Sequence, residues 1–111
     1  MKPDMFEQKI LAWYAAHASH TTVSAQCERA QVRSRISDSA GMFCHLDIPR
    51  DLAPCPDGLI FPGPVILGPD LPHGASVDLW ATSGKLDFIE VTALSNGTLQ
   101  EPYDRYEIRD E

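Results

Sequence analysis

Three cysteines and four histidines are the residues of this chain best suited to hold a metal ion or to act as a nucleophile. Cys44 and His45 are adjacent, so on a strand their side chains point to opposite faces and cannot grip one ion together. Cys55 and His73 lie in proline-rich segments and could join either of them. A zinc site formed by Cys44, Cys55 and His73 is therefore an open alternative, but we expect buried thiols and surface imidazoles, with no metal and no cofactor.

A cysteine nucleophile needs a neighbouring base that lowers the pKa of its thiol. Cys44 alternates with Met42 and Leu46, which places it on the apolar side of its strand, and we expect a small core residue there. No catalytic residue is assigned. An alternative remains open, namely a small enzyme or a ligand- or metal-binding domain. Its pocket would lie between the helices and the sheet and would contain Cys44, His45 or Glu90.

Three carboxylates fall on two neighbouring predicted strands, namely Asp78, Asp87 and Glu90. Such a group does acid–base chemistry only if burial separates the pKa values of its members. We expect surface carboxylates instead, or ion pairs with Arg33 or Arg35. The chain also has no glycine-rich phosphate-binding loop.

The negative charge of the chain is confined to its second half. Nine lysines and arginines against sixteen acidic residues give a net charge of −7 over 111 residues. Residues 1–56 carry six basic and six acidic residues, whereas residues 57–111 carry three basic and ten acidic ones. This balance argues against direct binding of nucleic acid. It fits either a solvated acidic surface or an acidic docking face for a basic partner.

The N-terminal residues, the most apolar stretch and the number of cysteines together indicate the cellular location that we expect. The N-terminus has acids and a proline where a secretory signal needs a long apolar stretch. The most apolar stretch, residues 58–68, is broken by proline and glycine and is too short for a bilayer. An odd number of cysteines is typical of reduced thiols. We expect a cytoplasmic protein without membrane association, folded as one domain over residues 1–111.

Helices are predicted at the start of the chain. Residues 4–19 have an amphipathic pattern, and Asp4 followed by Glu7 has capping-box spacing. The expected apolar stripe is Phe6, Ile10, Leu11, Trp13, Tyr14, His17 and Ala18. A second short helix is expected over residues 21–30, capped by Thr22, with Val23, Cys27 and Ala30 on one face.

From residue 31 the pattern changes to a period of two, which predicts strands. We expect Val32, Ser34 and Ile36 to share one face of the first strand, and residues 42–48 to return from a turn at 38–41. The other expected strands are residues 65–67, 75–82, 85–94, 98–100 after an Asn96–Gly97 turn, and an edge strand within 103–109. In residues 85–94 the apolar residues change face, which predicts a bulge near Phe88–Ile89 or a strand covered on both sides.

Helices first and strands afterwards, with short antiparallel connections, indicate an α+β fold. We expect an N-terminal helix, followed by a second one, packed on an antiparallel sheet of four to six strands. Residues 49–64 contain five prolines, which predicts a structured loop or an edge crossing.

Two stretches resemble a known group of proteins. Residues 41–49, Gly-Met-Phe-Cys-His-Leu-Asp-Ile-Pro, are similar to a phenylalanine-containing strand that ends in proline in small bacterial proteins. Residues 73–75 and 83–91 are similar to the later hairpin of the same proteins, and together the stretches cover 21 of the 111 residues. Some of these small acidic proteins are immunity proteins of contact-dependent growth inhibition and other polymorphic-toxin systems. This chain departs from them at residues 93–95, where aromatic residues and glycine are commoner.

The resemblance implies an immunity protein that binds a cognate toxin domain and neutralises it by occluding its active-site cleft. A basic nuclease is the leading candidate for that toxin, because such enzymes hold phosphates. Tryptophan and tyrosine are the usual anchors of an interface. The expected partner-binding residues are Asp78, Trp80, Asp87, Glu90, Tyr103, Asp104, Tyr106 and Glu107. Trp80 could instead pack under the first helix, and the tyrosines could be ordinary edge-strand residues. A subunit that dimerises through residues 98–109 is a third alternative, and the oligomeric state stays open.

Overall fold

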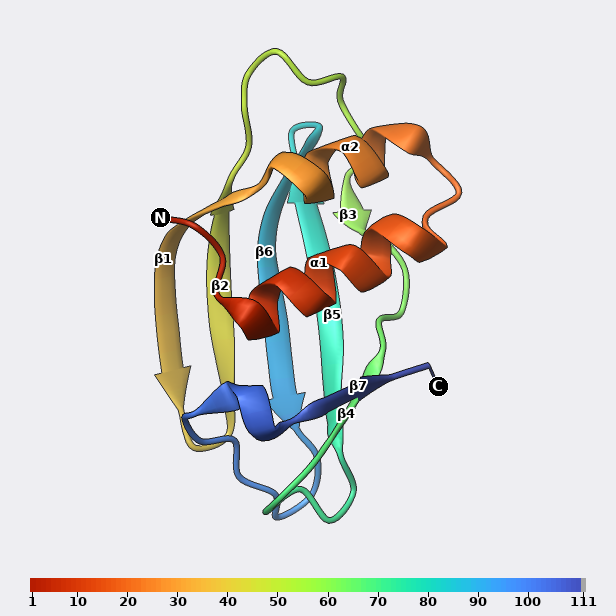
Figure 1. Cartoon of the computed structure of the whole chain (residues 1–111). Helices are drawn as coiled ribbons and strands as arrows, with labels where there is room; N and C mark the ends of the chain where they lie inside the picture. Colours follow the sequence, from red (N-terminus) through yellow and green to blue (C-terminus); the bar gives the residue numbers. More distant parts are fainter. Residues whose placement is uncertain (111) are drawn as a thin grey trace.

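The computed structural model describes residues 1–110 and has an α+β fold with two N-terminal helices on one antiparallel sheet (Figure 1). The strand order is β1-β2-β6-β5-β4-β7, and β3 pairs with the other end of β5. This confirms the predicted architecture, with seven strands in place of four to six. The elements are α1 (Met5–His17), α2 (Thr21–Arg29), β1 (Gln31–Asp38), β2 (Gly41–Asp47), β3 (Gly58–Leu59), β4 (Val65–Leu67), β5 (Ala75–Thr82), β6 (Lys85–Ala93), the 3₁₀ turn η1 (Tyr103–Arg105) and β7 (Glu107–Arg109).

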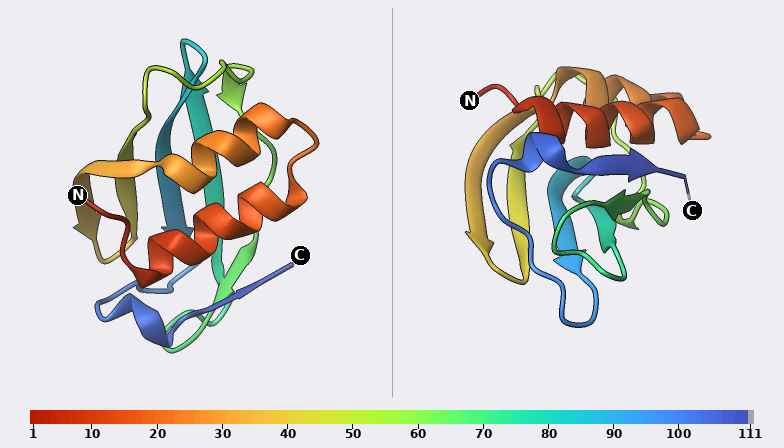
Figure 2. Two further views of the ribbon diagram at one scale, coloured as in Figure 1. Left: turned by 45° about the horizontal axis from the view of Figure 1, so that its top comes forward. Right: turned by 60° about the horizontal axis from the view of Figure 1, so that its bottom comes forward.

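Both helices lie on the same face of the sheet (Figure 2). The sheet curves around α1, with β1 near the start of the helix and β7 running beside it. The core lies between this concave face and the helices, and includes Ile10, Tyr14, Cys44, Leu79 and Ile89. Neither helix lies against the opposite face of the sheet, which we call the outer face.

Helix α1 begins where the sequence predicts, because its capping box is formed. The Asp4 carboxylate accepts the backbone N–H of Glu7 at 2.8 Å, and the Glu7 carboxylate accepts the N–H of Asp4 at 2.7 Å. The buried side of the helix is narrower than expected, because Trp13 is half-buried and His17 exposed. Helix α2 begins at Thr21 with His20 as its N-cap, so the predicted cap at Thr22 is wrong.

Glu7 joins α1 to the edge strand β1. Its side chain is fully buried and receives two hydrogen bonds from Arg35, at 2.6 and 2.7 Å. Burial alone would raise the pKa of Glu7, but the hydrogen bonds from Arg35 and from the Asp4 backbone outweigh burial and hold that pKa below its ordinary value. The same contact raises the pKa of Arg35 further. This is a bidentate, charge-assisted pair, the strongest class of side-chain hydrogen bond.

A bulge in β1 overturns the predicted facing of Ile36. The register shifts between Val32, opposite Leu46, and Ser34, opposite His45. One extra residue reverses the alternation that follows it, because side chains change face at each position. Arg35 therefore faces α1, and Ile36 lies on the outer face with 63% of its surface exposed.

The apolar residues of β6 change face because the strand contains a bulge, which confirms the first of the two predicted explanations. Trp80 lies opposite Phe88 and Ala81 opposite Leu86, so Asp87 is the extra residue. The bulge is one residue earlier than expected. It allows Leu86 on one side of it and Ile89 on the other to point into the same core.

The segment after β6 differs from the prediction. The chain turns at Ser95–Asn96, but residues 98–100 do not return as a strand. The N–H of Thr98 donates to the carbonyl of Asp70 at 2.8 Å, and that of Leu99 to the carbonyl of Ser39 at 2.9 Å. The segment thus crosses the end of the sheet. Of the predicted edge strand over 103–109, residues 107–109 form β7.

We expect Glu7→Gln to lower the free energy of unfolding by about 3 kcal/mol at pH 7, because it breaks a buried ion pair. The folded-state pKa of Glu7 lies below its unfolded value, so the ionised carboxylate stabilises the protein above about pH 4. That contribution disappears as the pH falls through the folded-state pKa. Urea unfolding at several pH values should therefore show the difference between wild type and variant shrinking in acid.

Glu107→Gln is the matched control, since Glu107 pairs with Arg109 at 2.9 Å on an exposed strand. Its effect should stay within about 0.5 kcal/mol. Equal losses in the two variants would contradict the role given to the buried pair.

Candidate functional site

The structure divides the predicted partner-binding residues between the two sides of the sheet. Asp78, Trp80 and Glu90 lie on the outer face, whereas η1 and Tyr106 lie on the helix side and pack against Phe6. The alternative that Trp80 packs under the first helix is therefore wrong. The outer face carries Ile36, Phe43, His45, Leu59, Asp78, Trp80, Phe88 and Glu90.

Aromatic side chains form a continuous row across the outer face. His45 is opposite Phe88, and Phe88 is opposite Trp80. The ring centroid of Phe88 lies 5.8 Å from that of His45, 5.7 Å from that of Phe43 and 6.2 Å from that of Trp80. Leu59 extends the row beyond Trp80. Phe43 and Phe88 were not among the predicted partner-binding residues, although Phe43 interrupts the polar side of its alternating strand.

Two carboxylates lie beside this row at directly opposite positions. Asp78 faces Glu90 across β5 and β6, and Glu90 in turn lies opposite Phe43. Within the described residues neither carboxylate has a lysine, arginine or histidine nitrogen within 4.0 Å. Like charges at opposite positions of an antiparallel pair repel each other. The free protein therefore carries an uncompensated pair of negative charges on its outer face.

Asp87, the third carboxylate of the predicted group, is paired. It occupies the bulge of β6, accepts the hydroxyl of Thr82 at 3.0 Å and lies 3.8 Å from a guanidinium nitrogen of Arg33. The contact between Asp87 and Arg33 is one of the surface ion pairs that the sequence predicts for this group of carboxylates.

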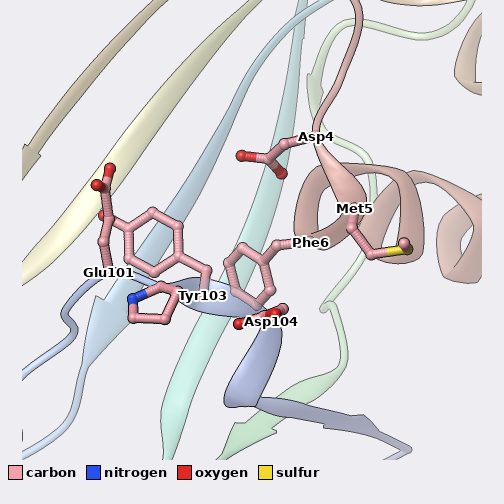
Figure 3. Close-up of a pocket in the computed structure, with 7 residues that line it drawn as sticks. Asp4, Met5, Phe6, Glu101, Tyr103 and Asp104 are labelled. Atoms are coloured by element: carbon pink, nitrogen blue, oxygen red, sulfur yellow. The ribbon is translucent and has the colours of Figure 1, made fainter.

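On the helix side, an acidic cleft of about 480 Å³ lies between the start of α1 and η1 (Figure 3). The rings of Phe6 and Tyr103 lie 5.4 Å apart, with the carboxylates of Asp4, Glu101 and Asp104 around them. Asp4 is already 3.9 Å from the guanidinium of Arg35 and serves as the N-cap of α1. Met5 and Pro102 complete the lining.

Tyr106 and Glu107 have local partners. Tyr106 is a core residue with 3% of its surface exposed, and its hydroxyl accepts the N–H of Gln100 at 3.0 Å. The Arg105 guanidinium lies over its ring, 5.3 Å from the centroid. Glu107 pairs with Arg109. The Tyr106 ring is therefore enclosed in the free protein and presents little surface to a partner.

The three thiols are buried and free. Burial raises the pKa of the Cys44 thiol, and the neighbouring Glu7 raises it further. Burial, with Cys55 and Glu28 nearby, raises the pKa of Cys27 to about 12, and burial also raises that of Cys55. All three are weak nucleophiles at neutral pH, because the thiolate is the reactive form.

The residues considered for an enzyme pocket lie on different sides of the sheet. Cys44 points into the core, while His45 and Glu90 lie on the outer face. His73 is in an exposed turn, and Cys55 is buried beside Gln26 with its sulfur 3.8 Å from the amide oxygen. Over residues 1–110, no group of three histidine, cysteine, aspartate or glutamate side chains is arranged to hold a metal ion.

Comparisons of the chain with protein-family models, with curated proteins and with solved structures found no match. Among the described residues, the two helices are too short and too polar to cross a bilayer.

We expect the thiols to react slowly with a disulfide reagent such as DTNB at neutral pH and rapidly after unfolding, because burial raises their pKa values. Absorbance at the wavelength of the released thiolate follows the reaction. One native cysteine that reacts faster than free cysteine would contradict this and would favour the enzyme alternative.

We expect Asp78→Asn to raise the free energy of unfolding by about 0.5 kcal/mol, since it removes the repulsion from Glu90. Thermal or urea unfolding at low salt measures the change, and added salt should reduce it. The control Asp47→Asn removes the same charge from an exposed strand position opposite the uncharged Gln31. A loss of stability in Asp78→Asn would show that this carboxylate is held by favourable contacts.

Proposed function

We propose that this protein is a bacterial immunity protein, which binds a cognate toxin domain and blocks its active-site cleft. The toxin is a basic protein, with a nuclease as the leading candidate. The single observation that carries the proposal is the set of carboxylates in residues 57–110 that have no cationic partner within 4.0 Å among the described residues. They are Asp57, Asp70, Asp78, Glu90, Glu101 and Asp104.

These charges favour a basic partner. Asp78 and Glu90 lie together on the outer face, and Glu101 and Asp104 lie together in the acidic cleft. A surface with this potential attracts a positively charged protein and repels nucleic acid. An inhibitor of this kind gains association rate from steering. The aromatic side chains of the outer face add the type of residue that anchors an interface.

A nuclease fits as the target because its active site must hold phosphate groups and is therefore basic. An acidic protein can fill such a cleft in competition with the nucleic acid substrate. Residues 41–49, 73–75 and 83–91 resemble stretches of small bacterial proteins, some of which are immunity proteins, and this resemblance supports the same proposal. Cys44 lies in the core whereas His45 and Glu90 lie on the outer face, so these residues give the enzyme alternative no comparable support.

The test is to co-express the tagged protein with the product of the reading frame immediately upstream in its source genome, and to weigh the eluate by native mass spectrometry. We expect a 1:1 complex with a basic polypeptide that is lethal when produced alone. Stopped-flow association should slow at least about tenfold between low and high salt, because charge speeds the encounter. A single species of 12.3 kDa would contradict the proposal.

A further inference from the structure

We infer that the outer face of the sheet is the docking surface, and that the partner inserts an arginine between Asp78 and Glu90. Apolar side chains next to that arginine would cover Phe43 and Phe88. The inference rests on the proposed function for the identity of the partner, but the surface and its chemistry are argued from this chain alone.

The outer face exposes more apolar surface than a solvated sheet needs. An antiparallel sheet with one free face is usually polar on that face. Here the six large hydrophobic side chains that are exposed among residues 1–110 include Ile36, Phe43 and Leu59, all on the outer face. Ile36 lies opposite Phe43, and the aromatic row continues from there. A contiguous exposed apolar patch of this kind marks an interaction site.

The carboxylates of Asp78 and Glu90 next to this patch favour a partner that carries a positive charge. Glu90 lies between Asp78 on one neighbouring strand and Phe43 on the other. A cation placed there would relieve the repulsion of two carboxylates at once. Arginine fits better than lysine, because its planar guanidinium binds carboxylates with two hydrogen bonds and also stacks on aromatic rings.

The same charges disfavour other occupants. A second copy docked face to face would bring Asp78 and Glu90 against the carboxylates of its partner, because an isologous interface pairs a patch with itself. Nucleic acid would bring phosphates to the same carboxylates. The acidic cleft is the competing surface for a basic partner, but its Asp4 already neighbours Arg35 and its Phe6 is 2% exposed. A basic protein surface therefore fits the outer face best.

The surface is also firmly held. Phe43, Asp78, Phe88 and Glu90, at the centre of this surface, come from β2, β5 and β6, which are paired along much of their length. The backbone of paired strands is already ordered, so binding costs little further backbone freedom, which favours affinity. The indole N–H of Trp80 is buried without an acceptor among the described residues, so Trp80→Phe should leave the free protein folded.

The surface can be tested without knowing the partner. The probe is N-acetyl-leucyl-arginine amide, titrated at millimolar concentrations into the ¹⁵N-labelled full chain, with N-acetyl-leucyl-glutamate amide as the control probe. We expect the shifts in the amide spectrum to centre on residues 43, 78, 88 and 90. The glutamate probe should leave these signals unchanged. Shifts centred on the acidic cleft, or no localised shifts, would overturn the inference.

Two matched double variants sharpen this result. Asp78→Asn with Glu90→Gln should weaken binding of the arginine probe at least about fivefold, because both ligands of the guanidinium lose their charge. Glu101→Gln with Asp104→Asn removes the same two charges from the acidic cleft and should leave binding within about twofold. Equal weakening in both would mean that net charge alone attracts the probe, which overturns the inference.

The co-expressed toxin separates this inference from the proposed function. If the toxin binds and the Asp78/Glu90 variant binds it as tightly as wild type, the function stands and the surface is wrong. If no toxin binds but the arginine probe maps to the outer face, the surface stands and the immunity function is wrong. Loss of toxin binding in the Asp78/Glu90 variant alone supports both.

Discussion

The buried carboxylate of Glu7 is the constraint on which the rest of the structure depends. This carboxylate accepts the backbone N–H of Asp4 at the start of α1. It also accepts two hydrogen bonds from the guanidinium of Arg35 on the edge strand β1. A buried charge is tolerated only when its hydrogen bonds are made. The helix start and the edge of the sheet must therefore be placed together, and this fixes how α1 crosses the concave face.

The opposite edge of the sheet is attached to the same helix. Asp110, after β7, accepts the indole N–H of Trp13 at 2.6 Å and lies 3.3 Å from His17. Helix α2 is attached differently: its buried Gln26 donates to the carbonyl of Gly84 and accepts the N–H of Leu86. Since both helices are held on the concave side, the outer face is left open, and its surface chemistry becomes available to a partner.

The two bulges decide which side chains reach that open face. The bulge in β1 turns Arg35 toward Glu7 and, by the same reversal, turns Ile36 outward. The bulge at Asp87 keeps Phe88 on the outer face while Leu86 remains in the core. A stabilising ion pair and an exposed apolar patch thus follow from one irregularity, which links the stability of the fold to the chemistry of its candidate interface.

The sequence by itself determined the α+β class, the capping box at Asp4 and Glu7, most strand positions and the acidic character of residues 57–111. These depend on local periodicity, local hydrogen bonds and composition. Tertiary structure decided that Ile36 and Phe43 share an exposed surface and that Tyr106 is enclosed. A bulge is set by contacts with other elements, and burial depends on what packs against a side chain, so neither can be deduced from alternation alone.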